Sequence, residues 1–457
     1  MTNRLDRDFH LPGLLRFALP TIIMMLVVSL YTIVDGVLIA RLVGENALAA
    51  ANVAYPAISV TLAMGIMLGT GGSAVVAHKM GAGYLEEARR DFGFLALVAV
   101  CIGLAVCLAG ALFAGPLARL LGASDLLLDD TVTYLRVQLC FAPMAMLQLL
   151  FESFFVTAGR PGLGLGLATA AGVTNAVLDY LYMGPMQMGI LGAALGTVTG
   201  YSIPAVAGGL FFLLRRQGLR FGRPHGDLRM LGRACFNGAS EMVTNLSMAV
   251  TTFLFNAIMM AYLGEAGVSA ITIVLYAQFL LVALYMGFSM GVAPVFSFNR
   301  GAGRYDRMRR IFGYCLRFIL VSSVAILVVA LALSGVVVGI FSTPGSQVYA
   351  IALDGFRRFA PAFLFAGVNI FSSALFTALS DGRTSAIISF ARTFGFLLLG
   401  LLLLPRLLEV DGVWLAVPLA ELLSCLLSVW FLRRKRADFG FGGGDLPRHG
   451  GRGGGRT

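Results

Sequence analysis

Charged residues are scarce in this sequence. Asp, Glu, Lys and Arg make up 12% of its 457 residues, whereas 58% of the chain is hydrophobic. A soluble domain usually has about 25% charged and 45–50% apolar residues. The apolar residues recur in long runs along the whole chain, such as 92–114, 190–214 and 384–405. This distribution excludes an ordinary soluble protein and indicates a membrane protein.

Residues that usually build metal, disulfide or nucleotide sites are also few. The six cysteines lie in or beside apolar runs without a Cys-x-x-Cys pair, and the four histidines are scattered outside the deep apolar segments. We therefore expect free thiols and no His-based metal site. The absence of a Gly-x-x-x-x-Gly-Lys-Ser/Thr stretch disfavours nucleotide-driven chemistry. The sequence predicts no catalytic residues, no enzyme activity and no cofactor.

The apolar runs have the length of membrane-spanning helices. About 20 apolar residues cross a bilayer as a helix, and in lipid every backbone amide must be paired within a helix or a closed barrel. Barrel strands would alternate over about ten residues, but these runs are longer and apolar on all sides. We predict an all-α polytopic fold with twelve spans, near 13–40, 50–77, 92–114, 131–157, 162–184, 190–214, 234–262, 268–298, 312–333, 350–379, 384–405 and 412–432.

Basic residues are distributed unevenly between the predicted loops. If the N-terminus is cytoplasmic, the outer connections and outer helix ends hold six of the 34 Lys and Arg residues, which leaves 28 on the inner side. Such a bias sets both termini in the cytoplasm, here of a bacterial cell (inner) membrane. The net charge of +11 then reflects topology and contact with anionic membrane lipids, and no nucleic-acid partner is expected.

The chain repeats itself at an offset of 220 residues. Gly81-Ala82-Gly83 recurs as Gly301-Ala302-Gly303, and Arg89-Arg90 recurs as Arg309-Arg310. Each half has an even number of predicted spans, so the halves share one orientation and are related by an axis along the membrane normal. We predict an N-terminal six-helix lobe, a cytoplasmic linker long enough to let the lobes move, a C-terminal six-helix lobe and a disordered Gly- and Arg-rich tail, at 1–214, 215–233, 234–438 and 439–457.

Acidic residues inside spans are costly, so each is a candidate functional residue. Asp35, Asp179 and Thr197 lie at similar depth in three first-lobe spans, and Tyr31 and Asn175 precede the two acids by four residues, on the same helix faces. Such a cluster can hold a proton, because two nearby negative charges disfavour joint ionisation, or it can coordinate Na⁺ through several oxygens. The alternative is a hydrogen-bond network that only holds the lobe together.

Other residues within the spans have two interpretations each. Pro20 interrupts the first span and is either a hinge or a static kink. Glu152 and Glu241, near inner helix ends, either take part in transport or pair with inner-loop arginines. Glu421 is either a cavity acid or a partner for Arg392. Met side chains re-pack around varied apolar ligands, so methionines are candidates for the substrate cavity beside the polar residues of the spans. The candidate cavity residues are Glu241, Gln278, Met286, Met290 and Glu421.

Several short segments, in this order and spacing, resemble those of a known family. They are Leu19-Pro20, Tyr31-Thr-Ile-Val-Asp35, Gly81-Ala-Gly83, Ala158-Gly-Arg-Pro161, Asn175-Ala-Val-Leu-Asp179, Gly192-Ala-Ala-Leu-Gly-Thr197, Tyr262-Leu-Gly-Glu265 and Gly412-Val-Trp-Leu-Ala-Val-Pro418. Over about residues 12–432 the chain resembles the multidrug and toxic compound extrusion (MATE) transporters, in particular their DinF-like bacterial branch.

The resemblance implies two six-helix bundles around a V-shaped central cavity, and drug efflux driven by H⁺ or Na⁺. The family's first-lobe cation site falls on Asp35, Asn175, Asp179 and Thr197, and its helix 1 proline falls on Pro20. Some members also use an acid in helix 10. Here helix 10 has Asn369 and no acid in its interior, which puts a second-lobe cation site in doubt.

Together these observations favour a monomeric secondary active transporter that exports bulky, often cationic organic compounds by antiport with H⁺ or Na⁺. Two alternatives stay open. A lipid-linked precursor flippase of the same superfamily would need a basic cavity for pyrophosphate; the mainly acidic mid-span charges disfavour it, whereas Arg392 keeps it open. A membrane-embedded enzyme would need a clustered His/Asp/Glu or Ser/Lys constellation, which the sequence does not contain.

Overall fold

The first half of the chain forms six spans. The computed structural model describes residues 4–436 and 438–439, and this part of the chain contains no β-strand. Helices α4 and α5 form one span that bends by 54° between them. After a short 3₁₀ turn η1 (Arg4–Asp6), the helices are α1 (Leu11–Leu42), α2 (Glu45–Gly81), α3 (Leu85–Leu120), α4 (Leu128–Cys140), α5 (Ala142–Thr157), α6 (Pro161–Met183) and α7 (Gly189–Leu214).

The second half contains one helical segment much longer than a single span. Helix α8 has 74 residues and would be about 110 Å long if it were straight, several times the bilayer core of about 30 Å. Helices α11 and α12 are one span bent by 55°. The elements are α8 (Leu228–Gly301), α9 (Tyr305–Ala332), α10 (Ser334–Phe341), α11 (Gln347–Phe359), α12 (Ala362–Ala378), α13 (Gly382–Phe390), the π-helical segment η2 (Ala391–Leu397) and α14 (Leu398–Arg434).

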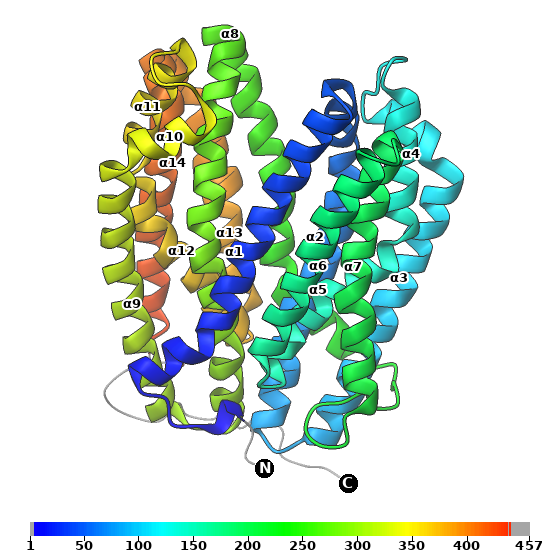
Figure 1. Cartoon of the computed structure of the whole chain (residues 1–457). Coiled ribbons are helices and arrows are strands. Elements are labelled where there is room, and N and C mark those ends of the chain that lie inside the picture. The colour runs from blue at the N-terminus through cyan, green and yellow to red at the C-terminus, as the bar shows by residue number, and fades with distance from the viewer. Residues whose placement is uncertain (1–3, 437, 440–457) are drawn as a thin grey trace.

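Two residues with positive φ interrupt the longest segments. Gly264 in α8 has φ 64°, and Glu409 in α14 has φ 51°. Glycine adopts this conformation freely, whereas Glu409 is strained there. Beyond Glu409, a β-carbon on Gly412 would clash with the carbonyl group of Leu404, although a straight helix would separate these residues by about 12 Å. Both segments are therefore helical hairpins, and Figure 1 shows α8 reaching the far end of the molecule and returning.

The hairpins complete the twelve predicted spans. Eight helices are long and apolar enough to cross a membrane, and the two bent pairs raise this number to ten. Counting the hairpins in α8 and in 382–434 as two spans each gives twelve. The two bends and the short helix α10 were not predicted, because a bend changes neither the length nor the composition of an apolar run.

The two lobes meet at the end of the molecule where both chain termini lie (Figure 1). Glycines mark the closest approaches, since small residues let helix backbones come together. The contacts form two pairs related by the 220-residue offset, so the sequence repeat becomes a two-fold symmetric interface. These contacts are Gly81 with Phe298, Gly301 with His78, Gly71 with Gly238, and Gly291 with Ala18.

Helix α1 contacts both lobes. Its first half packs on α8, where the backbone of Ile22 fills the space beside Gly287. Its second half packs on α6, where the ring of Tyr31 lies against Gly172. Pro20 lies inside the helix and removes one helical hydrogen bond. The proline predicted as a hinge or a kink therefore lies in the part of α1 that touches the second lobe.

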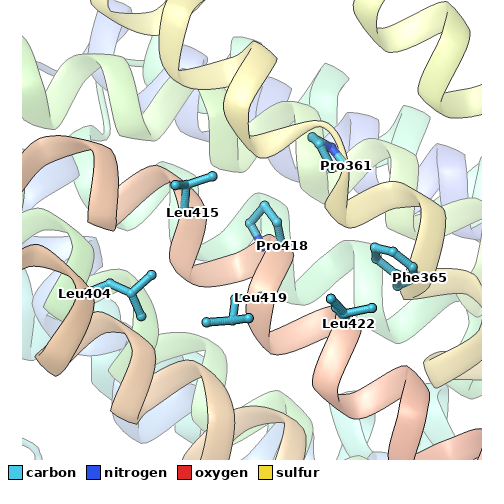
Figure 2. Close-up of a pocket in the computed structure, with 7 residues that line it drawn as sticks. All are labelled: Pro361, Phe365, Leu404, Leu415, Pro418, Leu419 and Leu422. Atoms are coloured by element: carbon cyan, nitrogen blue, oxygen red, sulfur yellow. The ribbon is translucent and has the colours of Figure 1, made fainter. Parts of the chain in front are cut away.

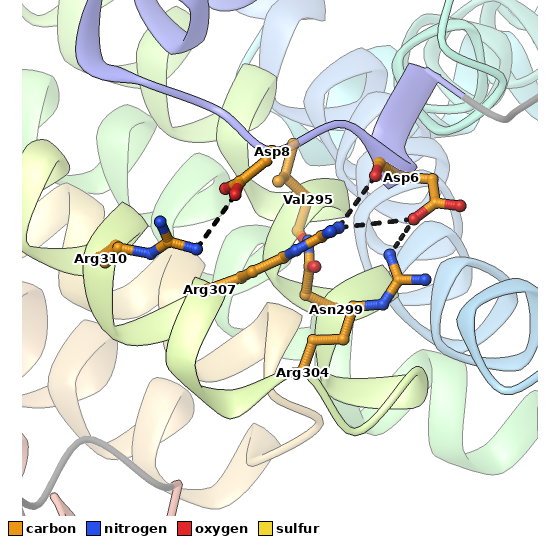
Figure 3. A network of polar contacts seen from close by, with 7 residues as sticks. All are labelled: Asp6, Asp8, Val295, Asn299, Arg304, Arg307 and Arg310. Carbon is orange, nitrogen blue, oxygen red and sulfur yellow. Dashed lines mark hydrogen bonds and ion pairs between the residues drawn. The ribbon is translucent and has the colours of Figure 1, made fainter.

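The segment before α1 is docked on the second lobe by ion pairs, as Figure 3 shows. Asp6 pairs with Arg304, and its backbone carbonyl accepts a hydrogen bond from Arg307 at 3.0 Å. Asp8 pairs with Arg310 at 3.1 Å. We call these five residues the N-terminal clamp. They join the first residues of the first lobe to the start of α9.

The segment before α8 is docked on the first lobe in turn. Since α8 begins at Leu228, the non-helical part of the predicted linker is 215–227. The backbone N–H of Gly222 donates to the carbonyl of Arg89 at 3.0 Å, and the ring of Phe221 stacks on that of Phe92, with 4.9 Å between centroids. The linker is therefore packed on the first lobe, and its role in letting the lobes move stays a prediction.

The end of α14 is held by the turn before α13. Lys435 Nζ lies 2.5 Å from a carboxylate oxygen of Asp381 and 2.5 Å from the hydroxyl of Thr384. Burial disfavours the charged form of Asp381, but the hydrogen bonds from Lys435 and Thr384 outweigh it and lower the pKa of Asp381. Phe439, the first residue of the predicted disordered tail, is buried against Phe376. The rest of that tail, 440–457, lies outside the described residues.

Candidate functional site

The carboxylates of Asp35 on α1 and Asp179 on α6 face each other, close enough to share a hydrogen bond when one is protonated. Asp179 is fully buried, and Asp35 is partly buried. Each keeps a buried oxygen, Oδ1, without a hydrogen-bond partner. In the described part of the chain, no Lys or Arg forms an ion pair with either acid. Two such carboxylates repel each other, so the pair needs a proton or a cation.

Two neighbours fix the position of Asp179. Asn175, one turn earlier on α6, donates from Nδ2 to Asp179 Oδ2 at 2.8 Å, as the four-residue spacing predicts. On α7, a β-carbon on Gly196 would clash with Asp179 Oδ1. The glycine is therefore required for α7 to approach the acid, and that oxygen lies directly against α7.

The other two predicted residues of the first lobe flank this pair. Thr197 follows the glycine on α7, but its hydroxyl donates to the carbonyl of Ala193 in its own helix at 3.0 Å. The hydroxyl of Tyr31 lies beside the amide of Gln148. The structure thus brings the two acids and the asparagine into direct contact, with the threonine and the tyrosine at the margin.

A second buried polar pair lies next to Tyr31. Gln148 Nε2 donates to Glu152 Oε1 at 2.9 Å, and both side chains are buried. Glu152 therefore does not pair with an inner-loop arginine, which was one of the two expectations for it. Tyr31 interacts electrostatically with both Glu152 and Asp35, so it connects the two polar groups. The signal in the sequence was the four-residue spacing of Gln148 and Glu152, which we did not use.

The second lobe has a different polar core. Arg392 in η2 donates to Glu421 Oε1 from Nε at 2.9 Å and from Nη2 at 2.5 Å. Asn369 Nδ2 donates to Glu421 Oε2 at 2.7 Å, and Ser428 Oγ donates to Asn369 Oδ1 at 3.1 Å. Of the two interpretations of Glu421, the structure shows the partner for Arg392. Its charge is neutralised inside the lobe, and only 4% of the residue is exposed.

The remaining cavity candidates lie on α8. All four have intermediate exposure. Met286 and Met290 each precede a glycine that packs on α1, so they lie beside the lobe interface. Glu241 lies about 20 Å along α8 from its first residue, deeper than the helix end at which the sequence placed it. Gln278 lies one helical turn after Val274, a buried residue of the second-lobe core.

Comparison with known proteins places these residues in a family. The sequence profile of the MatE family matches residues 20–181 and 242–402, one range in each lobe and together more than half of the chain. The chain belongs to the MatE family. This confirms the resemblance found in the sequence, while the DinF-like branch stays a prediction.

Relatives of this MatE chain match along nearly their whole length. Multidrug export protein MepA of Staphylococcus saprophyticus subsp. saprophyticus is 25% identical over 443 residues, which cover 92% of this chain and 94% of that protein. Multidrug export protein MepA of Staphylococcus haemolyticus is 23% identical over 428 residues, which cover 92% of both chains.

Solved structures share the fold of this MatE chain. An outward-facing multidrug resistance MATE family transporter of the MOP superfamily has a TM-score of 0.89 at 18% identity, covering 96% of this chain and 99% of that one. A MOP superfamily transporter from Pyrococcus furiosus, described as having a binding pocket of reverse polarity, has a TM-score of 0.86 at 19% identity, covering 93% and 96%. The predicted two-lobe, twelve-helix architecture is confirmed.

An apolar pocket of about 340 Å³ also opens in the second lobe of this MatE chain, between the start of α12 and α14 (Figure 2). A ligand site needs a few polar groups to fix orientation, but every lining residue here is apolar. None of the predicted site residues lines it, so the candidate chemistry stays with the two polar cores. The lining residues are Pro361, Phe365, Leu404, Leu415, Pro418, Leu419 and Leu422.

Proposed function

We propose that this chain is a secondary active multidrug efflux transporter, not an enzyme, and that it exports bulky, often cationic organic compounds in exchange for H⁺ or Na⁺. The observation that carries the proposal is the facing pair Asp35 and Asp179, with buried oxygens that lack partners. The similarity to proteins named multidrug export protein MepA supports drug export as the activity.

The coupling ion binds between α1 and α6 in this proposal. A proton shared by Asp35 and Asp179 removes their repulsion, and Na⁺ does the same with further oxygen ligands from Asn175 and Thr197. The carboxylates can take the proton, and carboxylate, amide and hydroxyl oxygens together suit a hard cation such as Na⁺. When the ion leaves, the repulsion returns and favours separation of α1 from α6.

Alternating access follows from the position of α1. Its outer half carries Asp35, and its first half packs on α8 of the other lobe beside Pro20. A change at the acid pair can therefore reach the lobe interface through one helix, with Pro20 as the hinge. Coupling requires that the ion binds one conformation more tightly than the other. The lobes touch at the end where α1 begins, and this supports a state that is open at the opposite end.

The cellular setting follows the predicted topology. We place the chain in the bacterial inner membrane as a monomer, with both termini and the lobe contacts on the cytoplasmic side. Glu241, Gln278, Met286 and Met290 then lie on the helix that borders the first lobe, where an amphipathic drug would pass. A flippase for lipid-linked precursors is less well supported, because the mid-span charges are mainly acidic and Arg392 alone does not make a basic cavity for pyrophosphate.

The test is ion exchange in proteoliposomes. Substrate-stimulated proton release and Na⁺ uptake are measured side by side, which also identifies the ion. We expect Asp35→Asn to abolish the substrate-dependent exchange, whereas Asp125→Asn, in an exposed loop, should not change it. Undiminished exchange in Asp35→Asn would rule out the first-lobe site.

A further inference from the structure

The second lobe holds a mid-membrane arginine that the proposed ion coupling does not use. Arg392 lies ten residues after the start of α13, or about 15 Å along the span. An arginine at this depth is costly and is a functional candidate by default. It also lies in the π-helical segment η2, none of whose residues is fully buried. Such segments are rare and often occur at functional sites.

The guanidinium group is only partly satisfied. Its two hydrogen bonds both end on one oxygen, Glu421 Oε1, while Oε2 is taken by Asn369. A guanidinium has five N–H donors and can bind a carboxylate through two parallel bonds. No further hydrogen bond from Arg392 occurs among the described residues, and 18% of its side chain is exposed, against 6% for Glu421. The arginine therefore has donors left for a second acceptor.

A second acid interacts with Arg392. It is Glu241 on α8, which feels the positive charge of the guanidinium. Glu241 lies one helical turn after Gly238, whose backbone packs on Met67 of α2 in the first lobe. The guanidinium thus lies between α14 and the face of α8 that borders the interface between lobes.

We propose that Arg392 binds the carboxylate of zwitterionic or anionic amphipathic substrates, and that Glu421 is the internal counter-ion that pairs with it when no substrate is bound. This rests on the proposed export function and names a substrate class for it. Replacing one carboxylate by another keeps the guanidinium paired throughout, so the cost of the exchange falls on Glu421 alone. Glu421 stays bound to Asn369 during the exchange.

The test compares two dyes that differ by one charge. Rhodamine B has a free benzoate, and its ethyl ester does not. Their dissociation constants are measured by fluorescence anisotropy with the purified full chain in lipid nanodiscs, so the readout does not depend on ion coupling. We expect Arg392→Gln to weaken binding of rhodamine B relative to the ester by about tenfold or more, the value of a charge-assisted hydrogen bond. Glu421→Gln removes the competing carboxylate and should shift the same ratio the opposite way.

Opposite shifts separate a binding role from a structural one. A purely structural ion pair predicts that both variants lose both dyes together, and that result, or an unchanged ratio in both variants, would overturn the inference. Arg406→Gln, at an exposed arginine further along the same span, is the matched control.

If Arg392→Gln fails to fold, the double variant Arg392→Met with Glu421→Met leaves no unpaired charge, and it should lose the preference for rhodamine B. If the wild type binds neither dye, the proposed function fails as well; if it binds both without the expected shifts, only this inference fails.

Discussion

The two lobes share one fold but treat buried charge in opposite ways. In the first lobe, Asp35 and Asp179 face each other without a basic partner. In the second lobe, Glu421 is paired with Arg392. The residue 220 positions after Asp35 is Phe255, which is buried in the apolar core of its lobe. In our proposal the first lobe therefore takes an ion from outside, whereas the second carries its own counter-ion.

The comparison shows that the two halves of the repeat share the same helix packing but not the same buried polar residues. The glycines at 81 and 301 make equivalent contacts across the lobe interface, because both lobes need the same close approach of helices. Polar side chains inside a lobe do not take part in that interface, so the two copies could diverge. One lobe was left with two facing acids that lack a basic partner, and the other with an ion pair whose arginine has spare donors.

The largest expected effect is the loss of ion coupling when an acid of the first lobe is replaced. The same kind of substitution in the second lobe is the comparison. Asp179→Asn should abolish ion-driven export in proteoliposomes, because a single carboxylate no longer needs the shared ion. Glu421→Gln should keep the number of ions exchanged per substrate at the wild-type value, since that acid already has a counter-ion. Loss of coupling in Glu421→Gln would mean that both lobes bind the ion, and the contrast between them would fail.

The second prediction concerns stability. Arg392→Met leaves Glu421 buried and unpaired, so the free energy of unfolding should fall by about 3–5 kcal/mol. The double variant with Glu421→Met should stay close to the wild type. In the first lobe, Asp35→Asn removes a repulsion and should not lower stability. Thermal unfolding in detergent compares the four proteins, and an equal loss in the single and double variants would contradict the isolated ion pair.

A smaller effect is expected from crowding the ion site. In Gly196→Ala the new β-carbon meets Asp179 Oδ1. Overpacking of this kind costs about 1–3 kcal/mol, so we expect the apparent ion affinity to fall about tenfold. The matched control is Gly166→Ala on α6, where a β-carbon has no neighbour within 4 Å. Equal behaviour of the two variants would show that the approach of α7 to the acid is not needed.

The smallest effect is expected at the segments that cross between lobes. The N-terminal clamp is ionic and partly exposed, whereas the linker docks on the first lobe through its backbone and Phe221. Exposed ion pairs contribute about 0.2–1 kcal/mol each and are screened by salt. Asp6→Asn with Asp8→Asn should therefore shift the balance of open and closed lobes only a few-fold.

Distances between spin labels at the terminal end of the two lobes, taken at low and high salt, measure that shift. Salt should move the wild type towards the double variant and leave the variant itself unchanged. A wild type that does not respond to salt would show that the clamp has no influence on lobe opening.

Much of the fold could be predicted because the signals are local. Hydropathy and segment length located all twelve spans, and helix periodicity placed Asn175 beside Asp179. The same periodicity could have found Gln148 and Glu152. The turn at Glu409 falls between the predicted spans 384–405 and 412–432. The bends in two spans were not predictable in this way, since they leave an apolar run unchanged in length and composition.

The sequence by itself determined the number of spans and the two-fold repeat, because each depends on a pattern within short stretches of the chain, and the basic residues predict the orientation of the spans. Only the tertiary structure decided that Asp35 meets Asp179, that Arg392 pairs with Glu421, and that Asp6 contacts Arg304. These contacts join segments far apart in the chain, and they depend on how each helix is rotated and how closely its neighbours pack. That geometry, not the inventory of charged residues, leaves one lobe in need of an ion and the other already neutral.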